Sequence, residues 1–368
     1  MGNFFPSIEM RDDPELINVR AEEALNLTRL EPWLRAHLPS TEGTLSVRQF
    51  GGGHANLTYL VRFDTTEYVL RRPPLGPVTP SSHDMTREHH VLSRLGVAFP
   101  LAPRSFALCQ DKSVLGVDFH VMERRTGFVI RTELPLALRS NTRAVRSLST
   151  MVVDTLATLH KVDPADVGLS DLGNPKGFVD RQLTGWSQRW HTAKNQELPA
   201  VDRLISWLAN DPPVSHVTTL LHNDYKLDNI LLSSTDPTRA TALLDWDMTT
   251  RGDPLMDLGY LLNVWVEPND PEPWRKTTAM PSHEAGFLSR REVIQRYAEQ
   301  TGFDVSKVVW YYAFGVFKLV VILQQIYIRF LRDQTQDPRF AALGPQIDAL
   351  ANKGTAIINS EGDLKTAS

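Results

Sequence analysis

Alternating apolar and polar residues in the first third of the chain predict a small β-sheet. Strands are expected over five short runs, 46–50, 57–63, 67–72, 104–109 and 118–123. Gly51-Gly52-Gly53 separates the first two runs, and two β-type runs joined by a Gly-rich turn are typical of a hairpin. One helix is expected before the fourth strand, from about residue 82 to residue 95. The pattern therefore indicates an antiparallel sheet with one helix, ending near residue 125.

The segments on either side of this sheet are expected to be mainly helical. A helix beginning at Pro14 is predicted from an apolar face made of Leu16, Val19, Leu27, Leu30, Trp33 and Leu34. Later apolar residues at helical spacing predict helices over 141–162, 257–266, 289–301 and 305–332. A β-rich stretch over 217–247 interrupts these helices, and the chain from residue 354 onward is expected to be loose.

A chain of 368 residues exceeds one core of ordinary size and favours two lobes. We therefore expect an α+β protein with a small antiparallel-sheet lobe and a larger, mainly helical lobe. The expected divisions are a helical extension over 1–40, the sheet lobe over 41–125, the helical lobe over 126–353 and a flexible tail over 354–368.

Composition narrows the class of protein. Hydrophobic residues make up 42% of the chain and charged residues 22%, as in ordinary globular proteins. The net charge of −4 gives no basic excess, so no nucleic-acid partner is expected. The single cysteine, Cys109, and the lack of a signal-like start favour a reducing, cytoplasmic location. The apolar run 310–328 is broken by Lys318, Gln324 and Gln325, which favours a buried helix over a membrane span.

One motif in the β-rich stretch points to a specific chemistry. His222-x-Asp224 follows an apolar strand, Asn229 stands five residues after the aspartate, and a second apolar strand ends in Asp245. Phosphoryl transfer needs a carboxylate that orients and deprotonates the attacking hydroxyl, and oxygen ligands for Mg²⁺. Asp224 suits the first task, and Asn229 and Asp245 suit the second. The motif therefore predicts a phosphotransferase that uses ATP and Mg²⁺.

In these residues the sequence resembles the aminoglycoside phosphotransferase and choline-kinase superfamily, which has a protein-kinase-like fold and the loop pattern His-x-Asp-x-x-x-x-Asn. Asp253 and Asp257 follow Asp245 at the spacing of that superfamily. The resemblance implies that Asp253 and Asp257 are structural carboxylates that brace the loop. Asp247 is open to two interpretations, assistance at the metal or a solvated loop position.

The resemblance also assigns nucleotide contacts in the sheet lobe. A glycine run between two strands is typical of a loop that covers phosphates, because backbone N–H groups can approach them closely. Arg71 stands where kinases usually carry a lysine for the α- and β-phosphates, with Glu88 as its expected partner and Glu123 at the adenine hinge. The guanidinium of arginine is a planar, forked donor, whereas the ammonium of lysine is a compact point charge. The expected nucleotide-binding residues are Gly52, Gly53, His54, Ala55, Asn56, Arg71, Glu88 and Glu123.

The helical lobe resembles one branch in particular, the bacterial phosphotransferases similar to the kinase-like domain fused to some acyl-CoA dehydrogenases. That branch implies a 4-hydroxyacyl-CoA or related hydroxy acid as the acceptor. Arg181, Trp186, Arg189 and Trp190 would suit such an anionic, base-bearing ligand. The alternative is that the arginines are ordinary surface charges and the tryptophans belong to the core.

Two other functions stay open from the sequence. An aminoglycoside or amino-alcohol kinase is the alternative enzyme, and a catalytically inactive nucleotide-binding regulatory module is the alternative from another class. The intact trio Asp224, Asn229 and Asp245 favours an enzyme. Arg71, which replaces the usual lysine, is the one departure from the kinase pattern. Lys318, inside an apolar helix, is expected either to pair with a structural aspartate or to line the substrate pocket.

Overall fold

The computed structural model describes residues 15–51, 56–76, 83–335 and 337–360. These residues form two compact units. The first comprises the described residues up to Phe128 together with Ala165–Leu169 and Ile230–Thr249. The second comprises Val129–Pro164, Ser170–Asn229 and the described chain from Thr250 onward.

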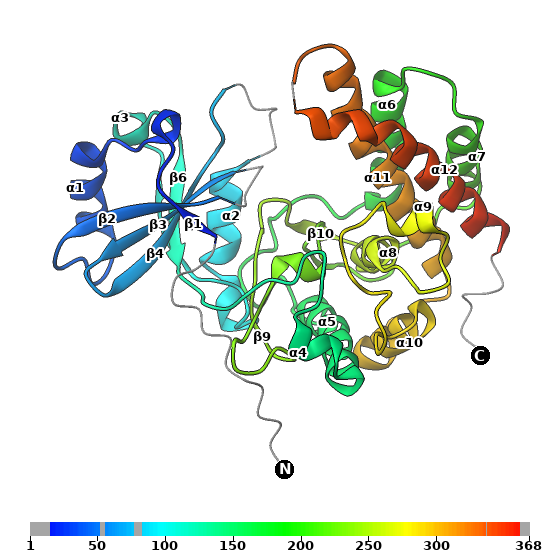
Figure 1. Ribbon diagram of the computed structural model, residues 1–368, viewed down its shortest axis with the longest axis horizontal. Coiled ribbons are helices and arrows are strands. Elements are labelled where there is room, and N and C mark those ends of the chain that lie inside the picture. The colour runs from blue at the N-terminus through cyan, green and yellow to red at the C-terminus, as the bar shows by residue number, and fades with distance from the viewer. Residues whose placement is uncertain (1–14, 52–55, 77–82, 336, 361–368) are drawn as a thin grey trace. The chain divides into compact units, whose positions relative to one another are not determined.

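A six-stranded antiparallel sheet organises the first unit (Figure 1). Its spatial order is β1-β2-β3-β4-β6-β5. The predicted hairpin is confirmed, because Leu45 pairs with Phe63 and Gln49 with Tyr59. The strands are β1 Leu16–Ile17, β2 Leu45–Phe50, β3 Leu57–Phe63, β4 Thr66–Arg72, β5 Ser105–Cys109 and β6 Phe119–Glu123.

Side chains alternate between the two faces of this sheet, as the pleat requires. Tyr59, Val61 and Phe63 of β3 pack with Leu30 and Leu34 of α1 (Leu27–His37) in one buried cluster. Helix α2 (Met85–Leu92) packs against β5 and β6, and the short α3 (Lys112–Leu115) packs against α1. The sheet is therefore covered by helices that come from different parts of the chain.

The predicted helix from Pro14 is wrong in its first half. Leu16 and Ile17 form an edge strand with β2, and a short 3-10 turn over Ala21–Glu23 follows. Helix α1 begins only after Asn26, whose side chain accepts a hydrogen bond from the backbone N–H of Arg29 at 3.3 Å. An asparagine at the N-cap satisfies a backbone N–H of the first turn, which favours starting the helix after this residue.

A second β-hairpin in the first unit carries the end of the predicted β-rich stretch. Strands β8 (Ile230–Leu232) and β9 (Ala240–Leu243) are antiparallel, with Ile230 opposite Leu243. The backbone N–H of Leu243 donates to Leu101 O at 2.8 Å, and Phe128 bridges Leu232. The hairpin is thereby joined to the unit that contains the large sheet.

Helices form most of the second unit, together with one two-stranded sheet of β7 (Thr219–Leu221) and β10 (Thr250–Gly252). Helices α8 and α11 lie side by side at its centre (Figure 1). The helices are α4 Leu136–Arg139, α5 Thr142–His160, α6 Phe178–Ala193, α7 Pro199–Asn210, α8 Leu255–Val264, α9 Glu272–Arg275, α10 Arg290–Thr301, α11 Val308–Leu331 and α12 Leu343–Asn359.

Helices α8 and α11 approach closely because each has a glycine at the crossing. A Cβ atom on Gly259 would lie 2.2 Å from Tyr311 O, and one on Gly315 would lie 2.6 Å from Gly259 O. Any side chain would therefore force the two helices apart. Within the described residues, α11 is the one helix long and apolar enough to cross a membrane by length and composition. In this structure it packs against α6, α7, α8 and α12.

The loose tail predicted from residue 354 begins later than expected, because α12 continues to Asn359. Ile357 is buried on this helix, and so is the whole side chain of Lys353. Lys353 Nζ donates to the backbone oxygen of Asn263 at 2.7 Å and to its side-chain oxygen at 3.2 Å. It also lies 5.6 Å from the ring centroid of Tyr312. The lysine thus ties α12 to the C-terminal end of α8.

Burial lowers the pKa of Lys353 to about 7, and the nearby charge of Arg290 acts in the same direction. In the unfolded chain the amine keeps its ordinary pKa of about 10.4. Between these values the unfolded state binds more protons, so stability should rise with pH, by at most about 1.4 kcal/mol per pH unit from this group. Chemical unfolding at pH 7 and pH 9 should show a smaller pH effect in Lys353→Met than in the unmodified chain. The exposed Lys276→Met should keep the full effect, and equal pH effects in all three proteins would contradict this assignment.

Candidate functional site

Asp257 fixes the backbone of the loop that carries the predicted base. This residue is buried in the first turn of α8, and its carboxylate accepts the backbone N–H groups of His222 at 2.6 Å and Asn223 at 2.8 Å. His160 Nε2 lies 3.3 Å from the same carboxylate, and its Nδ1 lies 2.6 Å from the Tyr297 hydroxyl. Burial alone would raise the pKa of Asp257, but these hydrogen bonds and the His160 ring hold it below its ordinary value. This geometry agrees with the bracing role that the resemblance implies.

Asp224 follows in this loop, with three donors on its carboxylate. The Tyr260 hydroxyl donates to Oδ1 at 2.9 Å. The Asn229 amide nitrogen lies 3.0 Å from Oδ2, and the Lys226 ammonium lies 3.2 Å from the same oxygen. Asn229 also donates to the backbone oxygen of Asp224 at 2.8 Å. The carboxylate is therefore oriented, and about a quarter of the side chain stays exposed.

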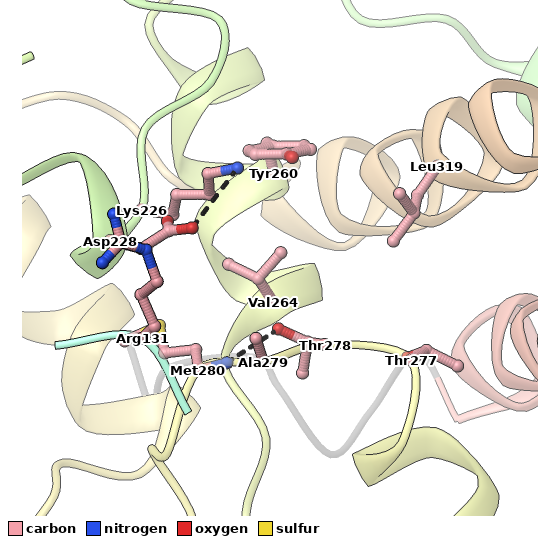
Figure 2. A pocket seen from close by; sticks show the side chains of 10 residues that line it. All are labelled: Arg131, Lys226, Asp228, Tyr260, Val264, Thr277, Thr278, Ala279, Met280 and Leu319. Carbon is pink, nitrogen blue, oxygen red and sulfur yellow. Dashed lines mark hydrogen bonds and ion pairs between the residues drawn. The ribbon is translucent and has the colours of Figure 1, made fainter. Parts of the chain in front are cut away.

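A cavity of about 170 Å³ includes in its lining two residues that contact this carboxylate (Figure 2). Lys226 and Tyr260, which contact Asp224, also line the cavity, while Val264 and Leu319 form an apolar wall. Burial raises the pKa of Asp228, and Asp224 adds to this, whereas Lys226 and Arg131 oppose it. The lining residues are Arg131, Lys226, Asp228, Tyr260, Val264, Thr277, Thr278, Ala279, Met280 and Leu319.

Arg71 forms the centre of a charged cluster in the first unit. Its guanidinium donates to Glu88 at 2.5 Å and also contacts Asp245, and its Nη2 lies 3.9 Å from Asp247. The second oxygen of Glu88 lies 3.1 Å from His120 Nε2. Burial would raise the pKa of Glu88, but Arg71 and His120 outweigh it and hold that pKa below its ordinary value. The predicted Arg71–Glu88 ion pair is present, while its contact with a nucleotide stays a prediction.

Asp247 is buried, so its interpretation as a solvated loop residue is wrong. Its carboxylate accepts the Asn56 side-chain amide at 3.0 Å. Burial raises its pKa to about 6, and the neighbouring charge of Asp245 acts in the same direction. Asp245 itself has a left-handed backbone, with φ of +68°. The two carboxylates thus share one turn after β9.

Glu123 ends β6, at the expected hinge position. Its backbone N–H donates to Arg104 O at 2.8 Å, and its carboxylate accepts the backbone N–H of Arg104 at 3.1 Å and pairs with Arg125 at 3.0 Å. These contacts stabilise the strand pair. The other expected nucleotide contacts in the glycine loop, at Gly52, Gly53, His54 and Ala55, lie outside the described residues.

The two predicted metal ligands belong to different units, Asn229 to the second and Asp245 to the first. The donor chemistry suits Mg²⁺, which prefers hard oxygen ligands and usually takes only one or two carboxylates besides phosphate oxygens. Since the amide nitrogen of Asn229 is bonded to Asp224, its oxygen is the atom suited to a metal. Within the ranges that the structure describes, no three His, Cys, Asp or Glu side chains converge as a metal cage.

The four residues expected at the substrate lie outside the cavity lining. The Arg181 guanidinium binds the backbone oxygens of Lys176 and Asn174, just ahead of α6. Trp190 is 1% exposed, so it belongs to the core, the alternative left open by the sequence. Arg189 lies over the Trp186 ring at 4.7 Å, and Trp186 is itself buried.

Several residues of this site were missed from the sequence. Lys226 stands inside the motif, two residues after Asp224, so its position was a usable signal. For Tyr260 the only signal in the sequence was its spacing from Asp257. It follows Asp257 by three residues, which places both side chains on one face of α8. Lys318 satisfies neither expectation, since its Nζ donates to the backbone oxygen of Asn223 at 2.9 Å.

Comparison with known proteins identifies relatives over most of the chain. The model of the phosphotransferase enzyme family matches residues 46–291. Acyl-CoA dehydrogenase family member 11 of Gallus gallus is 31% identical over 361 residues, which cover 94% of this chain and 45% of that protein. Member 10 of Mus musculus is 28% identical and is covered to 33%. The chain thus spans less than half the length of the curated relatives it matches.

Solved structures share the fold. A candidate aminoglycoside phosphotransferase from Ralstonia eutropha has a TM-score of 0.79 and 28% identity, and the match covers 91% of this chain and 99% of that one. Aminoglycoside phosphotransferase APH(4)-Ia, solved with AMP-PNP and hygromycin B, has a TM-score of 0.56 at 18% identity, with coverage of 88% and 98%. The family match extends over the motif, the braced loop and the Arg71 cluster. The chain belongs to the phosphotransferase enzyme family and has its kinase-like α+β fold.

Proposed function

We propose that this protein is an ATP-dependent kinase that phosphorylates a hydroxyl group of a small molecule, with Asp224 as the base. The observation that carries the proposal is the Asp224 carboxylate, held by Tyr260, Asn229 and Lys226 beside a cavity. A positioned carboxylate of this kind orients the attacking hydroxyl and accepts its proton. The transferred group then needs mainly positioning and charge stabilisation.

The nucleotide end of the proposal rests on the Arg71 cluster. Arg71 is suited to contact phosphate oxygens, and Glu88 keeps its guanidinium in place. Asn229 and Asp245 would hold Mg²⁺, which supplies positive charge that neutralises the phosphate oxygens. The complex of APH(4)-Ia with AMP-PNP supports ATP as the donor.

The cavity favours an acceptor with an apolar chain and an anionic or hydroxyl group. Its volume of about 170 Å³ is close to the 150 Å³ of an engineered cavity that takes one benzene ring. A short acyl chain matches this volume. Among the charged residues of the lining, Arg131 and Lys226 outnumber Asp228, which is less favourable for a polycation than for an anion. We therefore propose a 4-hydroxyacyl-CoA or a related hydroxy acid, a choice that the acyl-CoA dehydrogenase relatives also support.

An aminoglycoside acceptor is the second candidate, because APH(4)-Ia binds hygromycin B and shares the fold. ADP release from ATP should be faster with a 4-hydroxyacyl-CoA than with kanamycin at equal concentration. The comparison is best made by coupled spectrophotometric assay, with the non-hydroxylated acyl-CoA as the control. Turnover of kanamycin alone would overturn the proposed acceptor.

The variant Asp224→Asn should lower kcat by about 10²–10⁴-fold, the usual contribution of a general base. Asparagine keeps the size of the side chain and an acceptor oxygen for Tyr260, so the KM for ATP should change little. Steady-state kinetics measure both constants. The matched variant Asp348→Asn, on the exposed side of α12, should behave as the unmodified protein. An unchanged kcat in Asp224→Asn would show that the base is misassigned.

The variant Arg71→Met should cost about 3–5 kcal/mol of unfolding free energy, because it leaves the buried Glu88 carboxylate without its arginine. It should also raise the KM for ATP, whereas Arg71→Lys should retain part of both properties. Urea unfolding and initial-rate kinetics give the two readouts. Arg62→Met removes an exposed ion pair with Glu67 and should cost less than about 1 kcal/mol. Equal losses in both methionine variants would contradict the role of Arg71.

A further inference from the structure

Lys318 places a positive charge among apolar residues of α11. Its Nζ donates to the backbone oxygen of Asn223 at 2.9 Å. The same nitrogen lies 5.1 Å from the ring centroid of Tyr260 and 5.8 Å from that of Trp186, which are cation–π distances. Burial lowers the pKa of Lys318, and the charges of Asp257 and Asp224 oppose this shift. A cation in such surroundings is costly, so a function for it is expected.

The partner of Lys318 is the residue immediately before the proposed base. Asn223 has a left-handed backbone, with φ of +66°, a conformation that asparagine tolerates better than most residues. Its N–H donates to Asp257 at 2.8 Å, and its carbonyl oxygen accepts from Lys318 at 2.9 Å. Charged side chains of α8 and α11 therefore hold both polar groups of this turn.

Aromatic rings connect Lys318 to the Asp224 carboxylate by a second route. Tyr260 presents its ring face to Lys318 and donates its hydroxyl to Asp224 Oδ1 at 2.9 Å. Trp186 also lies near the Lys318 ammonium, and the Arg189 guanidinium lies 4.7 Å from its ring centroid. Cations and aromatic rings thus alternate across α6, α11 and α8, in the order Arg189, Trp186, Lys318 and Tyr260. Moving the ammonium would disturb both Asn223 and Tyr260, and each of these residues is joined to Asp224.

We propose that Lys318 is a positioning residue for phosphoryl transfer, holding the Asn223 turn and the Tyr260 ring so that Asp224 meets the acceptor hydroxyl. This inference rests on the proposed role of Asp224. It requires no contact between Lys318 and substrate, in agreement with the cavity, whose lining includes Leu319 and omits Lys318 (Figure 2). The competing role, direct binding of an anionic substrate by the ammonium, predicts different kinetics. A lost substrate contact raises KM, whereas a misplaced base lowers kcat.

The test is steady-state kinetics of Lys318→Met, with ADP release from MgATP measured both with a 4-hydroxyacyl-CoA and with water as the acceptor. A displacement of about 1 Å can cost about 10²-fold, so kcat should fall by about 100-fold. The KM for ATP should stay within about threefold. Lys318→Arg, which keeps the charge, should have a kcat at least tenfold higher than that of Lys318→Met. Arg329→Met, at the exposed end of the same helix, should leave both constants unchanged.

A double-mutant cycle separates positioning from a loss of folding. Trp186→Leu alone should lower kcat more than Trp186→Phe, which keeps a ring beside the ammonium. In the Lys318→Met background, Trp186→Leu should add no further loss, because the ring then has no Lys318 ammonium to hold. If Lys318→Met fails to fold by circular dichroism, the two Trp186 variants still decide the question. Equal kcat in Trp186→Leu and Trp186→Phe would overturn the proposal.

The outcome also separates this inference from the proposed function. Loss of activity in Asp224→Asn with unchanged kcat in Lys318→Met would overturn the positioning role and leave the base assignment intact. A raised KM for the acyl-CoA at unchanged kcat would assign Lys318 to substrate binding and would likewise overturn it. Full activity in Asp224→Asn would remove the basis of both proposals.

Discussion

The loop before β8 depends on the carboxylate of Asp257. A left-handed residue at Asn223 reverses the chain just before Asp224, so two successive backbone N–H groups are left without partners in a strand or helix. Asp257 accepts both of them at 2.6–2.8 Å. Each of these groups would otherwise cost about 1–3 kcal/mol if buried and unsatisfied. Burial would raise the pKa of this carboxylate, but His160 and the hydrogen bond from the backbone N–H of His222 hold it below its ordinary value.

The packing of α8 against α11 connects the loop held by Asp257 to the rest of the second unit. Gly259 and Gly315 allow the helices to touch, with no space for a Cβ atom at either position. Lys318 is three residues after Gly315 and therefore lies on nearly the same face of α11. The same crossing that packs the core thus brings the ammonium to the carbonyl of Asn223. Substituting either glycine would move a charged group of the site as well as a core contact.

The sequence predicted the features that depend on local pattern. The strand over 57–63 and the hairpin formed with it are as predicted, and the motif by itself predicts Asp224, Asn229 and Asp245 as site residues. The helix from Pro14 was wrong because the edge of the sheet and the cap at Asn26 override a continuing apolar face.

Residues whose roles arise from helix crossings could not be predicted. Tyr260 and Lys318 lie in apolar helices, where periodicity predicts burial but cannot predict a polar partner. The same limit applies to Trp186, which suits a coenzyme base by residue type and has the Arg189 and Lys318 cations near its ring. A cation and an aromatic ring in one sequence do not reveal whether they meet each other or a ligand.

The distribution of donors around Asp224 indicates which oxygen would receive the proton. A carboxylate has about four lone-pair sites, two on each oxygen. Oδ2 accepts from Asn229 and lies near Lys226, whereas Oδ1 has the Tyr260 hydroxyl as its donor. Oδ1 therefore keeps a lone pair for an acceptor hydroxyl. Lys226, at Oδ2, and Tyr260, at Oδ1, both line the cavity, so a group held there is near both oxygens, and the free lone pair favours Oδ1. The residue that orients the base is thus also a wall of the space from which its substrate would come.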